Sequence, residues 1–322
     1  MRLLKLVPEN TNIRFTKWRH LAMAISIGMI IASIALVATR GLNLGVDFVG
    51  GQMVRVTFAQ PVPLDEVRKT VEAMGQGEPT VQQFGSPNDV SIRMALPKGG
   101  EGAANAAATR LKQAILAKHP DAKFGSVDTV SGKVSNELFR TGAISMALAM
   151  LAISVYIWFR FEWQFGIGAL FALVHDVALT FGFFALTRLE FDLNSVAAVL
   201  TIIGYSLNDT IVVYDRIREN LRKYRKMEII PLLDLSTNET LARTIMTSLT
   251  MIIALVCLLI WGPETIFGFT AAMLLGIFIG TYSSIYMAAP ILIWMKVGPH
   301  SFVPREGAAA RGAERVGDGA VP

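Results

Sequence analysis

The stretch at residues 193–214, LNSVAAVLTIIGYSLNDTIVVY, decides the fold of this chain. Its length and apolar composition match a helix that crosses the hydrocarbon core of a bilayer, which takes about 20 residues. It nevertheless carries Asp209. A charged side chain at membrane depth costs about 2.5 to 3.5 kcal/mol on insertion scales, so such a residue usually faces a protein interior and marks an ion or proton path. We therefore expect a helical bundle in a membrane, with Asp209 in its interior.

Five further apolar runs of comparable length accompany this stretch. Hydrophobic residues make up 52% of the chain and charged residues only 17%, whereas a typical soluble domain carries about 25% charge. The sequence therefore predicts an integral membrane protein of the α-helical class. The first run also resembles a cleaved signal sequence, but its apolar core exceeds the roughly 7 to 15 residues of a signal peptide, so we expect a retained helix. The six predicted spans are residues 21–38, 139–158, 165–186, 193–214, 240–261 and 267–295.

Lys and Arg residues cluster in the first twenty residues and in the connection after the fourth span. Short cytoplasmic flanks of membrane helices are enriched in these residues, so we place both segments, and with six spans also the C-terminus, in the cytoplasm. The last residues are rich in Ala, Gly and Arg, a composition typical of disorder. The predicted organisation is a cytoplasmic N-terminus at 1–20, a first span at 21–38, an outer domain at 39–138, a bundle of five spans at 139–302 and a disordered cytoplasmic tail at 303–322.

The outer domain shows its own pattern of strands and helices. Alternating apolar residues predict strands, and two longer segments, one of them following Pro63, predict helices. The order strand, helix, strand, strand, helix, strand is that of a small ferredoxin-like α+β sandwich. The predicted strands are residues 52–58, 81–84, 90–96 and 124–130, and the predicted helices are residues 64–74 and 103–118.

Searches for catalytic motifs exclude several classes of protein. The sequence contains no phosphate-binding Gly-rich loop followed by Lys and Ser or Thr. Its four histidines are far apart, so we expect no metal site and no cofactor. Cys257 is the single cysteine and cannot form an intrachain disulfide. The net charge of +5 is a topology signal and not a sign of nucleic-acid binding. We expect a protein that is not an enzyme and that draws its energy from a gradient or a partner.

Asp209 has a candidate partner in the fifth span. Helical neighbours recur at three and four residues, which places Ser206 on the face of Asp209 and Thr247 on the side of Arg243. Because the two spans run antiparallel, we expect Asp209 and Arg243 to meet at the same depth. A movement that separates an acid from a base changes its proton affinity, which predicts a proton path; the alternative is a salt bridge that only holds two helices together. Asn208 either supports the carboxyl group or packs against a helix.

The third span contains a second polar pair, His175 and Asp176. A histidine titrates near neutral pH and an aspartate can relay a proton. The pair therefore indicates either a second part of a proton route or an interhelical hydrogen bond that fixes packing. In the sixth span, Gly276 and Gly280 form a step of small residues that lets helices approach closely.

Four segments together resemble a known family. They are GVDFVGG at residues 45–51, VHDV around His175 and Asp176, SLNDTIVVYDRIREN at residues 206–220 and LARTIMTSLT around Arg243. This set is similar to the SecF family of the bacterial protein-export machinery, a branch of the RND superfamily with six spans and one outer domain after the first span. The resemblance covers almost the whole chain apart from the tail.

The resemblance implies a function and a set of partners. Members of this family work with SecD beside the SecYEG channel in the bacterial inner membrane, where the proton-motive force pulls preproteins across the bilayer. Asp209 and Arg243 would then be the proton-path acid and arginine, and SecD would supply a further acid. The outer domain would serve as a docking and hinge element. Gly50 and Gly51 allow a tight turn out of the membrane, and Asp47 belongs to that motif or is a simple cap or turn residue.

Two other functions remain open from the sequence. One is gradient-driven export of lipids or small molecules, which other members of the superfamily perform, although a domain of about a hundred residues leaves little room for a substrate pocket. The other is a structural subunit whose charged pair never titrates.

Overall fold

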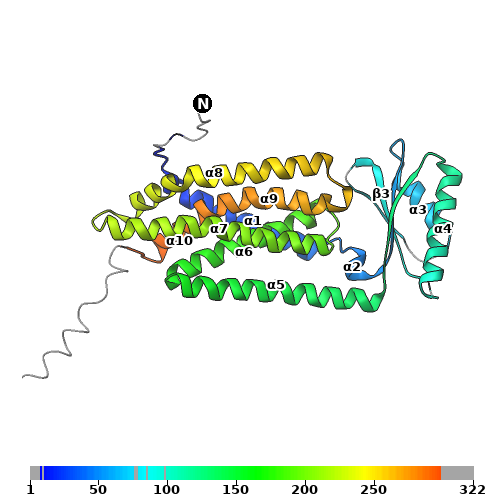
Figure 1. Cartoon of the computed structure of the whole chain (residues 1–322), viewed down its shortest axis with the longest axis horizontal. Coiled ribbons are helices and arrows are strands. Elements are labelled where there is room, and N and C mark those ends of the chain that lie inside the picture. The colour runs from blue at the N-terminus through cyan, green and yellow to red at the C-terminus, as the bar shows by residue number, and fades with distance from the viewer. Residues whose placement is uncertain (1–7, 9–10, 76–78, 85, 98, 299–322) are drawn as a thin grey trace, which may run out of the picture.

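The computed structural model describes residues 8, 11–75, 79–84, 86–97 and 99–298 of the chain. Long helices run side by side along one axis of the molecule, and a small domain of strands and helices stands at one end (Figure 1). The predicted disordered tail at 303–322 lies outside the described residues. The structure is therefore an α-helical bundle with a small α+β domain, which confirms the predicted fold class.

Within the described residues, six helical segments are long and apolar enough to cross a membrane, and each coincides with a predicted span. α7 and α8 extend well beyond their apolar parts, because helical hydrogen bonding continues through polar residues that a hydropathy pattern does not detect. The bundle contains the 3₁₀ turn η1 (Phe15–Trp18), α1 (Arg19–Arg40), α5 (Gly132–Arg160), α6 (Trp163–Thr187), α7 (Leu193–Lys223), α8 (Ile229–Trp261), the 3₁₀ turn η2 (Glu264–Ile266), α9 (Phe267–Ser283) and α10 (Ala289–Trp294).

The sixth span is interrupted. Between α9 and α10 the chain forms a π-helical turn, η3 (Ser284–Ala288). Pro290 lies in the first turn of α10. A proline inside a helix lacks a donor N–H and clashes with the carbonyl group four residues earlier, and a π turn relieves such a conflict by inserting one residue. We attribute the interruption to Pro290.

α7 and α9 pack closely because α9 presents glycines to α7. A Cβ atom added at Gly276 would lie 2.4 Å from Ile202 Cγ1, and one at Gly280 would lie 3.0 Å from Ser206 Cβ. Both distances are too short for an ordinary side chain. The small-residue step predicted from the sequence is therefore confirmed as a helix contact, and it brings α9 against the face of α7 that carries Ser206.

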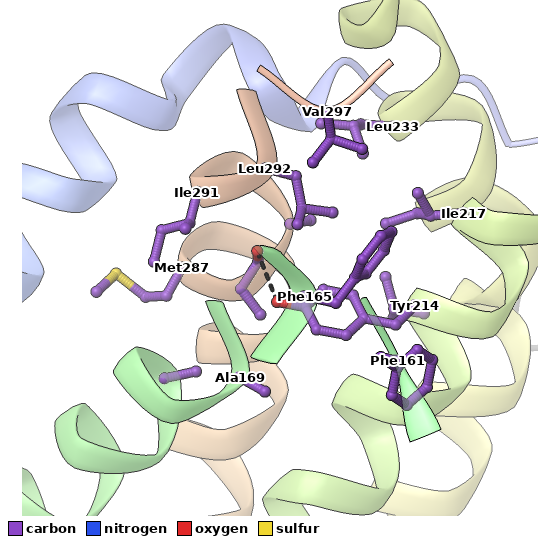
Figure 2. Packing of buried hydrophobic residues seen from close by; sticks show 14 of the residues in the cluster. Phe161, Phe165, Ala169, Tyr214, Ile217, Leu233, Met287, Ile291, Leu292 and Val297 are labelled. Atoms are coloured by element: carbon purple, nitrogen blue, oxygen red, sulfur yellow. Dashed lines mark hydrogen bonds between the residues drawn. The ribbon is translucent and has the colours of Figure 1, made fainter. Parts of the chain in front are cut away.

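A cluster of buried apolar side chains joins α6, α7, η3 and α10 (Figure 2). Phe165 and Tyr214 meet edge to face with ring centroids 5.0 Å apart. The Tyr214 hydroxyl donates a 3.0 Å hydrogen bond to the carbonyl oxygen of Ala288, at the end of η3. A Cβ atom at Gly168 would lie 2.3 Å from this hydroxyl oxygen, so only glycine leaves room for it. The π turn is thereby fixed to α7.

The outer domain has the predicted order of elements. Its antiparallel sheet has the strand order β2-β3-β1-β4, the order of a ferredoxin-like sandwich, and α3 and α4 lie on the side of the sheet away from the bundle (Figure 1). Val54, Ile92 and Leu111 are fully buried between sheet and helices. The elements are β1 (Gly51–Thr57), α3 (Leu64–Glu72), β2 (Thr80–Phe84), β3 (Ser86–Met94), α4 (Gly100–Lys118) and β4 (Lys123–Val130).

Candidate functional site

Asp209 lies in the interior of the bundle, where its side chain is held by hydroxyl groups from two other elements. Thr244 of α8 donates a 2.6 Å hydrogen bond to Oδ1, and Ser284 of η3 donates a 2.7 Å hydrogen bond to Oδ2. Asp209 is only 8% exposed. No ion pair to this carboxyl group is present among the described residues. Asp209 lies inside the bundle as expected. Its carboxylate is stabilised by hydrogen bonds from neutral hydroxyl groups.

The expected contact between Asp209 and Arg243 is not formed, and this prediction is wrong for the structure. Arg243 is exposed on the outer surface of the bundle. Successive residues of an α-helix point about 100° apart around its axis, so Arg243 turns away when Thr244 faces α7. Thr247 is also exposed, and its hydroxyl donates to the backbone oxygens of Arg243 and Thr244 at 3.0 Å. The two helices do match in depth, but a neutral residue makes the contact.

Asn208 does not support the carboxyl group of Asp209. Its side chain is exposed, and within the described part of the chain it makes no hydrogen bond with Asp209. The same angular argument applies, because Asn208 precedes Asp209 by one residue in α7.

Asp176 of α6 forms a second buried carboxyl site. It is fully buried and accepts hydrogen bonds from Ser283 at 2.8 Å and from Ser206 of α7. His175 Nδ1 lies 2.8 Å from Asp176 Oδ1. The structure thus shows the interhelical hydrogen bonds that were one of the two alternatives for this pair, and they link α6 to α7 and α9. Ser206, which was expected beside Asp209, binds Asp176 instead.

His175 also reaches the edge of a cavity. Its Nε2 atom is buried and has no hydrogen-bond partner among the described residues. His175 lines an apolar cavity of about 730 Å³ between α1, α6 and α9, together with Ser33 and Tyr282. The Tyr282 hydroxyl is already bonded to Ser26 and to the backbone oxygen of Ala22 of α1, both at 3.0 Å. His175 therefore links the two features, because its Nδ1 contacts Asp176 and the residue also lines the cavity.

Sequence reasoning missed the two serines that bind these acids. Ser283 and Ser284 are consecutive residues, yet one binds Asp176 and the other binds Asp209. The only signal in the sequence is a pair of hydroxyl residues in an apolar span shortly before Pro290. Such residues often bond to their own helix backbone, so their contacts with two acids on other helices required the tertiary structure.

The GVDFVGG segment lies in the chain between α1 and β1 of the outer domain, and it contacts the start of α7. Its first part forms the short helix α2 (Val46–Val49), and Asp47 Oδ2 accepts a 3.0 Å hydrogen bond from the backbone N–H of Leu193, the first residue of α7. Gly50 and Gly51 have φ angles of 75° and 120°, and a Cβ atom at Gly51 would lie 2.7 Å from the carbonyl oxygen of Met94. Asp47 thus contacts the start of α7, whose N-cap residue is Asp192, and the two glycines adopt the positive φ angles that a tight turn requires.

Glu190 is a further acid, half-buried at the junction between the outer domain and the bundle. Burial raises its pKa to about 7; Arg55 and Arg93 of the outer domain oppose this shift, and Asp192 and Asp47 add to it. A Cβ atom at Gly45 would lie 2.7 Å from Glu190 Oε1, so the linker after α1 passes directly over this carboxyl group. Glu190 lies in the short connection between α6 and α7 and was not among the site residues predicted from the sequence.

Polar contacts on both sides of Glu190 dock the outer domain on the bundle. The side-chain amides of Asn43 and Gln82 exchange hydrogen bonds of 2.7 and 3.1 Å. Arg93 of β3 donates to the backbone oxygen of Leu44. Phe191, next to Glu190, pairs its backbone with the linker at Asn43 and Gly45. The outer domain therefore rests on the loop that precedes α7.

Comparisons with known proteins agree with this architecture. A model of the C-terminal region of the protein export membrane proteins SecD/SecF matches residues 110–298, and a model of the SecD/SecF GG motif matches residues 35–62. The chain is 43% identical over 304 residues to the protein translocase subunit SecF of Rhodobacter capsulatus, covering 91% of both chains. It is 42% identical over 290 residues to that of Rickettsia akari, covering 90% of this chain and 94% of the relative.

Two solved structures are also similar to this chain. The crystal structure of SecDF, a translocon-associated membrane protein from Thermus thermophilus, matches with a TM-score of 0.82 and 31% identity. The match covers 90% of this chain but only 40% of that longer chain. SecDF in a super-membrane-facing form matches with a TM-score of 0.62 and 28% identity, over 95% of this chain and 40% of that one. The chain therefore belongs to the SecD/SecF family of protein export membrane proteins.

Proposed function

We propose that this chain is a SecF-type subunit of the Sec preprotein translocase that, together with SecD, uses the proton-motive force to drive late steps of translocation across the bacterial inner membrane. The full-length relatives are named protein translocase subunits, which supports the translocation role. The solved SecDF chain is longer than this one, which covers 40% of it. A separate SecD partner is proposed to supply the remainder, and the SecYEG channel to hold the preprotein.

Asp209 is the observation that carries this proposal. As a carboxylate it accepts two hydrogen bonds and donates none, whereas a protonated carboxyl group must donate one. Gain or loss of a proton therefore changes the bonding between α7, α8 and η3, the three elements that meet at this residue. A proton that crosses the membrane potential releases about 2.3 kcal/mol per 100 mV, which is comparable to the gap of a few kcal/mol between conformers.

Arg243 has a different place in the proposal than the sequence suggested. It is a charged side chain on the outer surface of a membrane span, a position that is costly in lipid unless a partner covers it. We assign this surface of α8 to SecD, whose own acid would face Arg243. Under this arrangement Arg243 acts across the subunit interface, and Thr247 lies on the same exposed side of α8.

The test is proton-driven translocation in vesicles that hold the channel, SecD and this chain. Asp209→Asn keeps the shape of the side chain and a hydrogen-bonding group but cannot exchange a proton. We expect it to abolish the proton-dependent part of translocation while assembly with SecD is retained. The exposed neighbouring variant Asn208→Ala serves as the control and should behave as the wild type. Translocation at the wild-type rate in Asp209→Asn would overturn the proposal in favour of a structural subunit.

A further inference from the structure

We infer that Ser283 and Ser284 are positioning residues that couple the two buried acids, so that a change of protonation at Asp209 is transmitted to Asp176 through one turn of helix. This inference rests on the proposed function, because it assumes that Asp209 exchanges a proton.

Each serine hydroxyl has two acceptors within reach. Ser284 Oγ lies 2.7 Å from Asp209 Oδ2 and 3.0 Å from the backbone oxygen of Thr281. Ser283 Oγ lies 2.8 Å from Asp176 Oδ2 and 3.1 Å from the backbone oxygen of Gly280. A hydroxyl group has one proton to donate and two lone pairs that accept. Each serine can therefore turn its proton from the acid to its own helix backbone without leaving any group unpaired.

This choice of acceptors suits an acid that titrates. When Asp209 takes up a proton on Oδ2, the new O–H donates to Ser284 Oγ, and the Ser284 proton moves by rotation to the Thr281 carbonyl oxygen. Thr244, on the other carboxyl oxygen, has no second acceptor for its hydroxyl among the contacts of the described residues. Oδ2 is therefore the oxygen that binds the proton. In this step the Ser284 hydroxyl exchanges its hydrogen bond to Asp209 for one to the Thr281 carbonyl oxygen, and no covalent bond of the serine is broken.

The π turn makes the two serines respond together. Ser283 is the last residue of α9 and Ser284 is the first residue of η3, so both lie where the helix geometry changes. π turns occur frequently at functional sites and are short interruptions inside an α-helix. The far end of η3 is held by Tyr214, which bonds to Ala288. The proposal therefore requires that the exchanged hydrogen bond at Ser284 also shifts the first turn of η3, which carries the change to the adjacent Ser283 and through it to Asp176.

The other titratable groups of this part of the bundle do not bridge the two acids. His175 of α6 bonds to Asp176. Tyr205 of α7 donates to Ser248 of α8 at 3.1 Å, and Tyr282 of α9 bonds to Ser26 of α1. Arg243 of α8 is exposed. Within the described residues, the contacts that connect the Asp209 site to the Asp176 site run through α7, where Ser206 precedes Asp209 by one turn, and through the serine pair.

The experiment measures the pH dependence of proton-driven translocation in the complete complex in vesicles. Ser284→Ala and Ser283→Ala should each lower the rate about tenfold or move the pH midpoint by about one unit, the size expected when a hydrogen bond to a carboxylate is lost. Ser154→Ala is the matched control, since within the described part of the chain the Ser154 hydroxyl bonds only to the backbone oxygen of Met150 in α5. It should leave rate and midpoint unchanged. Ser284→Cys, which keeps a weaker donor, should lie between alanine and wild type, and it replaces Ser284→Ala if that variant does not assemble.

Coupling is tested by combining Ser284→Ala with Asp176→Asn. Non-additive effects on the pH midpoint support the inference, whereas additive effects overturn it and leave the serines with a local packing role. Wild-type profiles in both serine variants also overturn it. These results are distinguishable from failure of the proposed function, because that failure appears as normal translocation in Asp209→Asn, whatever the serine variants do.

Discussion

Thr244 donates a 2.6 Å hydrogen bond to the carboxylate of Asp209, and this bond links the fifth membrane helix to the fourth at the depth of the buried acid. The donor is neutral, so the negative charge of Asp209 is stabilised by hydroxyl groups alone. A carboxylate held by neutral donors can take up a proton without breaking an ion pair, whereas one fixed in a salt bridge cannot. The position of Thr244 therefore favours an exchanging acid over a static helix-to-helix ion pair.

Removing the Thr244 hydroxyl should destabilise the bundle. Thr244→Val keeps the shape of the side chain and leaves Asp209 Oδ1 without its donor, a loss of about 1 to 3 kcal/mol for a buried charged group. We expect a lower thermal unfolding midpoint of the purified chain. Thr250→Val is the control, because Thr250 is exposed and its hydroxyl bonds, among the residues that the structure describes, only to the backbone oxygen of Thr247. Equal midpoints for the two variants would contradict the importance of this bond.

The contact between α7 and α9 should not tolerate a side chain at Gly276. A methyl group there would lie 2.4 Å from Ile202, and overpacking of this kind costs about 1 to 3 kcal/mol. We expect Gly276→Ala to lower the unfolding midpoint and the yield of folded protein. Gly204→Ala in α7 is the matched control, since an added Cβ atom there meets nothing within 4 Å. An unchanged midpoint in Gly276→Ala would show that the two helices separate at little cost.

The turn into the outer domain should depend on Gly51 for two reasons. Its φ angle of 120° is unfavourable for a residue with a Cβ atom, and that atom would also lie 2.7 Å from the Met94 carbonyl oxygen. Gly41→Ala separates these effects, because Gly41 has a φ angle of 65° but open space around it. We expect Gly51→Ala to expose β1 to limited proteolysis well beyond Gly41→Ala. Similar digestion of both variants would assign the whole effect to backbone strain.

Docking of the outer domain should weaken as the pH rises. The pKa of Glu190 is raised by burial from 4.5 to about 7, so the docked state binds more protons than the separated state between these values. The stabilisation is fully present below about pH 4.5 and is lost as the pH rises through about 7, by at most about 3 kcal/mol. Thermal unfolding of the outer domain between about pH 5 and 8 measures this slope.

Glu190→Gln should remove most of that slope, because glutamine stays neutral at every pH. The exposed Glu72 of α3 provides the matched control, and Glu72→Gln should retain the wild-type dependence. A Glu190→Gln variant that still loses stability over this range would locate the proton-sensitive group elsewhere.

Much of the architecture follows from local patterns. Apolar runs give the membrane helices, alternation gives the strands of the outer domain, and the cost of a charge in lipid places Asp209 inside the bundle. The two consecutive glycines at 50 and 51 indicate their positive φ angles without any tertiary information. These features depend on the chemistry of neighbouring residues, which the sequence contains.

The partners of the acids were decided by the tertiary structure alone. Whether Arg243 or Thr244 faces Asp209 depends on a rotation of α8 about its axis by roughly one residue, about 100°, and that rotation is set by how the helices pack. The same holds for Ser283 and Ser284, which reach two different acids because η3 interrupts the helix between α9 and Pro290. The sequence by itself determined which elements form and which carboxyl group is buried, since hydrophobicity acts locally. The donors that surround that group depend on contacts between helices far apart in the chain, and only packing fixes them.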